Sequence, residues 1–155
     1  MPATPISAAT DDQIRTIRVH KETYIAAPID IAYECILDEL GPENQLPGKP
    51  MPMVLESFPG GRWYRDLGNN AGHFWGHVQV IKPPTLIEIA GPLFMSYAGS
   101  NHLQYKLRAE GEGTWLTFLH TGFGLIAEDH LQGVNEGWQG SLNRIIELAK
   151  KRIAT

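Results

Sequence analysis

The sequence lacks several features that would restrict its location or its partners. Cysteine occurs once, at Cys35, so no internal disulfide can form, which fits a reducing cytoplasm. No apolar run approaches the ~20 residues of a membrane-spanning helix, and the N-terminus lacks the basic and apolar parts of a signal peptide. The longest basic cluster is Lys150-Lys151-Arg152, and the net charge is −4. We therefore expect a cytoplasmic protein that neither spans a membrane nor binds nucleic acid.

Signatures of catalysis and of metal binding are also missing. No Ser-centred or Cys-centred nucleophile motif occurs, and Cys35 is expected to pack inside a short helix. His73 and His77 share one strand but lie about 13 Å apart, too far to hold one zinc ion. The sequence thus predicts no cofactor, no metal and no catalytic residue. Glu56 and Glu88 lie in strands of undefined facing, and either one facing inward would permit acid–base chemistry.

The composition is that of one globular domain. Hydrophobic residues make up 43% of the 155 residues and charged residues 19%, which is enough apolar surface for a sizeable core. We predict a polar, flexible leader over residues 1–14 and a single domain over residues 15–152.

Residues 128–152 predict one long amphipathic helix. Apolar side chains recur there at steps of three or four, on one stripe of a helix: Leu131, Val134, Trp138, Leu142, Ile145 and Ala149. Gly133, Gly137 and Gly140 interrupt this helix and together cost about 2–3 kcal/mol relative to Ala. They indicate close approach of a loop or partner chain, a kink that widens a cavity mouth, or tolerated surface positions.

The remainder predicts an antiparallel sheet, because alternating residues and turn signals define consecutive hairpins. We expect seven strands, at residues 15–26, 53–58, 62–67, 73–82, 85–90, 101–110 and 114–122. A short amphipathic helix over 29–40 follows the first strand. The proline-rich stretch 41–52 is expected to be irregular, with room for one helical turn.

Several segments carry a family resemblance through their order and spacing. They are Tyr24 to Pro28, Phe58 to Trp63, Gly76 to Val78 with Pro83-Pro84 and Leu86, Gly113-Thr114 with His120 to Phe123, and Gly137-Trp138 with Leu142. Together they resemble the START-like, or SRPBCC, superfamily, which includes the birch-pollen allergens. Within it the chain looks most like proteins with the activator-of-heat-shock-protein-90-ATPase homology domain. The resemblance covers residues 15–152 and implies an α+β helix-grip fold, in which a seven-stranded curved antiparallel sheet wraps around the long C-terminal helix.

The space between sheet and helix is then either a pocket or a filled core. Tyr105 and His120 are the polar residues of the inward-facing set, so they are predicted to orient a ligand's carbonyl or hydroxyl group. Alternatively, both are core residues that hydrogen-bond within the protein. The full set of predicted ligand-binding residues is Phe74, Val78, Leu103, Tyr105, Phe118, His120, Leu131, Val134 and Trp138.

Three functions remain open at this point. The first is binding of a small hydrophobic or amphipathic ligand between the sheet and the last helix. The second is a cyclase-like or dehydratase-like enzyme without metal, and the third is a chaperone-interacting module like the heat-shock-protein-90 ATPase activators. Apolar segments at residues 51–55 and 93–97 are expected either to fold over a pocket mouth or to form a homodimer interface.

Overall fold

The computed structural model describes residues 13–155, so the predicted leader lies outside the described residues except for Gln13 and Ile14. Two helices are present in the described part, α1 (Ile29–Leu40) and α2 (Glu128–Ala154). The strands are β1 (Arg15–Ile25), β2 (Gln45–Leu46), β3 (Lys49–Pro50), β4 (Val54–Leu55), β5 (Arg62–Gly68), β6 (Ala71–Lys82), β7 (Leu86–Gly91), β8 (Gly99–Glu110) and β9 (Gly113–Gly124).

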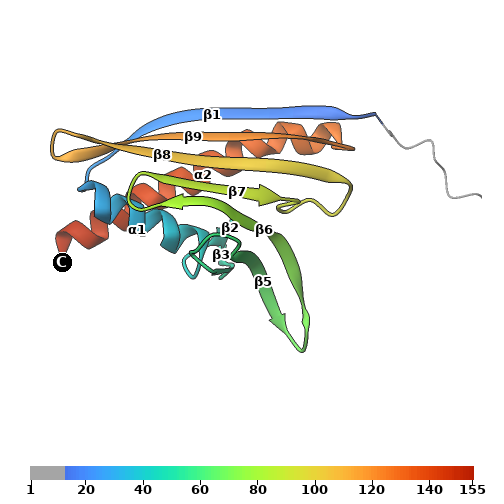
Figure 1. The fold of residues 1–155 in the computed structure, drawn as a ribbon, viewed down its shortest axis with the longest axis horizontal. Coiled ribbons are helices and arrows are strands. Elements are labelled where there is room, and N and C mark those ends of the chain that lie inside the picture. Colours follow the sequence, from blue (N-terminus) through green and yellow to red (C-terminus); the bar gives the residue numbers. More distant parts are fainter. Residues whose placement is uncertain (1–12) are drawn as a thin grey trace, which may run out of the picture.

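Seven of the strands form one antiparallel sheet in the order β1-β9-β8-β7-β6-β5-β4. Neighbours from β9 to β4 are consecutive in sequence, and β1 closes the order by pairing with β9 along its whole length. The sheet curves over α2, while α1 lies beside α2 on the same face (Figure 1). The predicted helix-grip fold is therefore confirmed.

The proline-rich stretch differs from the prediction. Its middle forms the small antiparallel hairpin β2–β3, in which Gln45 pairs with Pro50, and contains no helical turn. Gly48 closes this hairpin with φ at +81°, a conformation that glycine adopts without steric cost. The Met51 amide also donates to the Asn44 carbonyl at 2.8 Å, which fixes the hairpin beside the end of α1.

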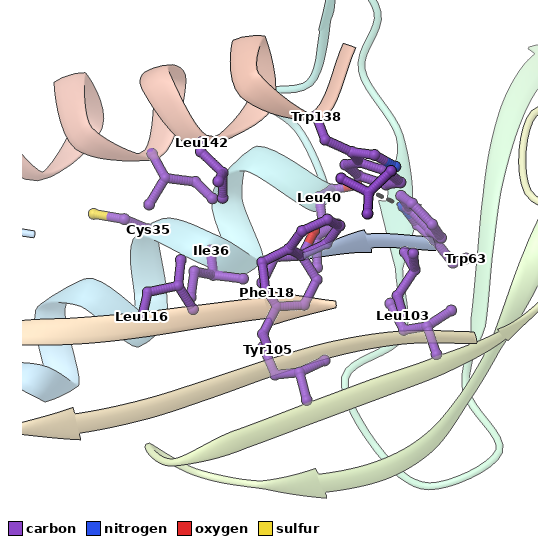
Figure 2. Close-up of a cluster of buried hydrophobic side chains, with 14 of the residues drawn as sticks. Cys35, Ile36, Leu40, Trp63, Leu103, Tyr105, Leu116, Phe118, Trp138 and Leu142 are labelled. Carbon is purple, nitrogen blue, oxygen red and sulfur yellow. Dashed lines mark hydrogen bonds between the residues drawn. The ribbon is translucent and has the colours of Figure 1, made fainter. Parts of the chain in front are cut away.

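The two ends of α2 carry charges that suit the helix dipole, and its middle packs on the sheet. Glu128 and Asp129 lie in the first turn, whereas Lys151 and Arg152 lie in the last. The predicted apolar stripe is buried from Val134 to Ala149, and Leu131 at its start is half-buried. Figure 2 shows Trp138 and Leu142 on the side of α2 that faces the buried Phe118 of β9. No helix within residues 13–155 qualifies as a membrane span.

The alternation of β6 breaks at Trp75, and this overturns one prediction. Trp63 of β5 pairs with Gly76, but the next residue, Tyr64, pairs with Phe74, so Trp75 is an extra residue in the ladder. Such a bulge reverses the facing of the residues beyond it. Trp75 therefore packs against the core, whereas Phe74 is 43% exposed, and the expected inward facing of Phe74 is wrong.

Candidate functional site

The structure contains an open cavity of about 670 Å³ beside α2. Its walls come from the end of α1, the segment 44–51, β5, β6, the β7–β8 loop and one face of α2. Nineteen residues line it, namely Glu39, Leu40, Asn44, Gln45, Leu46, Pro47, Met51, Trp63, Trp75, Phe94, His130, Gly133, Val134, Glu136, Gly137, Trp138, Gly140, Ser141 and Arg144. A volume of this size is typical of small-molecule sites, which hold drug-sized ligands in mainly apolar surroundings.

One wall of the cavity is a chain of aromatic rings. Trp63 meets Trp75 edge to face with ring centroids 5.0 Å apart, and Trp75 meets Phe94 in the same way at 5.6 Å. The ring centroid of Phe94 lies 6.2 Å from that of Trp138 of α2, which extends the chain of rings to the helix. The Trp63 indole donates to the Leu40 carbonyl at 2.7 Å, which ties this wall to the end of α1 (Figure 2). Each such ring pair adds about 0.5–1.5 kcal/mol beyond its burial, so the wall is well ordered.

The opposite wall is the glycine face of α2, formed by Gly133, Gly137 and Gly140. Their spacing of four and three residues places them on one side of the helix. A Cβ atom at Gly133 or Gly137 would have no heavy atom within 4 Å, so neither glycine serves the close approach of a loop. All three glycines instead line the cavity.

Glu39 is the charged group at the inner end of the cavity. Its carboxylate is almost fully buried and accepts hydrogen bonds from Ser141 Oγ at 2.7 Å and from Arg144 Nη2 at 2.8 Å. Burial raises the pKa of Glu39 to about 7, although these hydrogen bonds act to lower it. The group therefore titrates near neutral pH, and it joins α1 to α2 across the cavity wall.

Sequence reasoning missed Glu39, although the signal was present. The residue follows Cys35 by four positions and Ile36 by three, so it lies on the buried stripe of α1 rather than on its polar face. A carboxylate at such a position needs buried partners, because an unpaired charge in a core is very costly. The partners come from 102 and 105 residues further along the chain, and no local pattern predicts them.

His120 is buried, as predicted, but it does not line the cavity. The Trp138 indole donates to His120 Nδ1 at 2.9 Å, so the other ring nitrogen carries the proton and donates to Asn101 Oδ1 at 2.8 Å. Both ring nitrogens are thus used within the protein. Burial lowers the pKa of His120 to about 4, which keeps the imidazole neutral. His120 holds the Trp138 ring in place, in agreement with the alternative of a core histidine.

The other predicted site residues divide between the core and the cavity. Val78, Leu103, Tyr105 and Phe118 are buried in the core and do not line the cavity. Leu131 is half-buried and packs against that core. Val134 and Trp138 are the two members of the predicted set that line the cavity.

Tyr105 retains one unexplained feature. Its hydroxyl is buried and has no hydrogen-bond partner among the described residues. Burial raises its pKa well above the usual range, with a further contribution from the Glu39 charge. The phenol is therefore neutral at any physiological pH.

The two apolar segments noted in the sequence fold onto the protein. Met51 and Met53 are buried, as are Leu93 and Met95, and both Met51 and Phe94 line the cavity. Tyr97 forms a hydrogen bond with His130 Nδ1, which links the β7–β8 loop to the first turn of α2. These contacts favour a lip over the cavity for both segments.

The two glutamates of undefined facing lie on the outer side. Glu88 accepts from His102 at 2.9 Å and from Gln104 at 3.2 Å, whereas Glu56 pairs with Arg62 at 2.9 Å. Neither forms a hydrogen bond with His120 or Tyr105, and among the described residues Glu39 is the buried carboxylate. Among the described residues, no three His, Cys, Asp or Glu side chains are grouped to hold a metal ion.

The fold is that of a helix-grip protein, and an open cavity lies beside α2. Residues 26–150 match the family model described as "Activator of Hsp90 ATPase homolog 1-like protein". The chain therefore belongs to this family, as its motifs predicted. No curated protein matches the sequence.

Several solved structures share the fold at low sequence identity. A putative uncharacterized protein from Rhizobium leguminosarum aligns with a TM-score of 0.68 and 15% identity over 90% of this chain and 97% of its own. The Zhui aromatase/cyclase from Streptomyces sp. R1128 aligns with a TM-score of 0.65 and 19% identity over 90% of this chain and 96% of its own. A protein from Chromobacterium violaceum aligns with a TM-score of 0.67 and 20% identity over 86% of this chain and 96% of its own. These likenesses confirm the architecture.

Replacing Glu39 by Gln tests its raised pKa. Because the folded-state pKa lies above the usual 4.5, the folded protein binds this proton more tightly than the unfolded chain does. The contribution of Glu39 to the free energy of unfolding is therefore complete below about pH 4.5 and is lost as the pH rises to about 7. Each unit by which the folded-state pKa exceeds the unfolded-state pKa corresponds to about 1.4 kcal/mol of this contribution. Urea unfolding across this range should show the wild-type advantage over E39Q shrinking with pH, and parallel curves would contradict the assignment.

Replacing His120 by Gln should have the opposite pH signature. The folded-state pKa lies below 6.5, so the contribution of His120 is complete above about pH 6.5 and is lost as the pH falls to about 4. At neutral pH we expect H120Q to lower the free energy of unfolding by about 1–3 kcal/mol, because Trp138 or Asn101 loses a well-placed hydrogen-bond partner. Urea unfolding of H120Q measures both the loss of stability at neutral pH and its pH dependence. The control is His73→Gln, which changes an exposed histidine of β6. Equal acid sensitivity of H120Q and wild type would refute this role.

Proposed function

We propose that this protein binds a small hydrophobic or amphipathic ligand in the cavity between α2, the end of α1 and the aromatic wall. The observation that carries the proposal is the combination of an open cavity of about 670 Å³ with a helix face made of glycine. Gly133, Gly137 and Gly140 each lower the stability of the helix by about 1 kcal/mol relative to Ala, and no packing contact requires their small size. Access of a ligand to the cavity would account for glycine at these three positions.

The aromatic rings suit such a ligand. Trp63, Trp75, Phe94 and Trp138 offer large apolar faces, and the surface that lines the cavity is mainly apolar. An apolar ligand gains about 25 cal/mol for each Å² that it buries against these rings. The two methionine-containing lip segments can adapt to ligands of different shapes, since the thioether chain is flexible.

An acid–base enzyme is the second candidate, and one observation favours it. Glu39 is a buried carboxylate at the cavity wall whose pKa of about 7 suits proton transfer at neutral pH. The Zhui protein of the same fold is described as an aromatase/cyclase. A cyclase-like or dehydratase-like reaction would use Glu39 as the proton acceptor, and E39Q would then abolish turnover. The chaperone-interacting alternative rests on the family description.

Filling the cavity tests the leading proposal. We expect Gly137→Leu to abolish binding of the neutral fluorescent probe N-phenyl-1-naphthylamine, because the new side chain occupies open space beside Trp138. Gly137→Ala should keep binding and stabilise the helix by about 1 kcal/mol. Fluorescence titration measures the first effect and thermal unfolding the second.

The matched control is Asn135→Leu, which adds the same side chain to an exposed position of α2 outside the cavity. Its probe affinity should equal that of the wild type. Probe binding that survives in Gly137→Leu, or that is absent from the wild type, would contradict the proposal. Mass spectrometry of small molecules extracted from the purified protein would then identify a retained natural ligand.

A further inference from the structure

The guanidinium of Arg144 has one nitrogen without a partner at the polar end of the cavity. Its Nη2 and Nε atoms donate to Glu39 Oε1 at 2.8 and 3.3 Å. Its Nη1 atom meets no acceptor among residues 13–155 and lies over the helix at Gly140, 3.6 Å from where a Cβ would stand. Arg144 lines the cavity with a side chain that is 27% exposed, so this donor is accessible from the cavity.

We propose that Arg144 Nη1 anchors the carboxylate of an amphipathic ligand whose apolar body lies along the aromatic wall. This inference rests on the proposed binding function and adds the chemistry of the ligand's head group. A guanidinium only donates hydrogen bonds, and its bonds to carboxylates are about twice as strong as neutral ones. The low polarity of the surrounding cavity strengthens such a pair further.

The neighbouring polar groups do not offer an equivalent site for a cation. Both oxygens of Glu39 are already engaged, one by Arg144 and the other by Ser141. The remaining carboxylate of the cavity, Glu136, is exposed, and solvent and salt weaken its influence. A cationic head group at this end would therefore face the positive charge of Arg144, which repels it.

The charge balance of the site suits an anion that arrives together with a proton. Ionised Glu39 and Arg144 form a neutral pair, so an added carboxylate leaves one excess negative charge in the cavity. Protonation of Glu39 removes this excess, and its pKa of about 7 makes the proton available at little cost. The groups that face Glu39 are Ser141 and Arg144 of α2 and, at longer range, Tyr105 of β8, whose phenol stays neutral. Binding of the carboxylate therefore takes up as much as one proton.

Glycine at position 140 permits this contact. A larger side chain there would stand within van der Waals distance of Nη1 and cover it from the cavity. Gly140 thus exposes the donor of the head-group site, just as Gly133 and Gly137 leave space for the ligand's body.

The test compares ligands that share one apolar chain. Isothermal titration calorimetry measures the affinity of the wild type for decanoate, decanamide and decylamine. We expect decanoate to bind about tenfold more tightly than decanamide near neutral pH, with weak binding of decylamine. In two buffers of different ionisation enthalpy, decanoate should show uptake of a proton, and decanamide should show none.

Variants separate the head group from the cavity. Arg144→Gln should abolish the preference for decanoate, and Lys151→Gln on the exposed part of α2 should retain it. Should Arg144→Gln fail to fold because Glu39 loses its partner, Glu39→Gln supplies the second variant. It keeps Arg144, so it should still prefer decanoate, but without proton uptake.

Equal affinities for decanoate and decanamide, or a preference for decylamine, would overturn the inference while N-phenyl-1-naphthylamine binding still upholds the cavity as a ligand site. Proton uptake that persists in Glu39→Gln would also overturn it. Failure of the neutral probe and of all three decyl compounds to bind would instead refute the proposed function itself.

Discussion

The packing of α2 against the curved sheet is the constraint on which the rest of the structure depends. Trp138, Leu142 and Ile145 are buried against the sheet and α1, and they fix the position of the whole helix. The glycine face of α2 and the segment 44–51 both line the cavity. Because glycine has no side chain, this face of the helix leaves the space open. The core and the cavity are thus two consequences of one helix with two different faces.

Polar contacts transmit this arrangement to the site. His120 links Trp138 to Asn101, which donates in turn to the carbonyls of Gly91 and Pro92 at 3.3 Å. This network joins the cavity wall to the loop that carries Phe94. At the other end, Glu39 joins α1 to Ser141 and Arg144. Both networks are at least partly buried, so a change to either one alters the stability of the fold together with the shape of the cavity.

The sequence predicted the architecture well because sheet facing and helix stripes are local patterns. The inward facing of Tyr105 and Phe118 is correct, since β8 and β9 pair without interruption. Phe74 was misplaced because a bulge at Trp75 depends on the pairing with β5, which alternation along one strand does not reveal. The facing of β6 beyond its bulge therefore required the three-dimensional structure.

The candidate site was predicted less completely, because the predicted inward-facing sheet residues do not line the cavity. Val134 and Trp138 were identified from the helix stripe, whereas the hairpin β2–β3 and Glu39 come from segments whose role depends on distant contacts. The interrupting glycines of α2 were the strongest signal for the cavity in the sequence, where a widened cavity mouth is one of three interpretations. They were weighed as contacts, a kink or surface positions, and the structure shows that they line the cavity.

The most direct test of the central claim is nuclear magnetic resonance mapping of ligand contacts on the labelled protein. Titration with decanoate or the neutral naphthylamine probe should shift the amide signals of Gly133 and Gly137 and the indole signals of Trp63 and Trp138. This outcome would place the ligand between the glycine face and the aromatic wall. Shifts confined to the exposed β5–β6 end near Phe74, with unchanged glycine signals, would contradict the account.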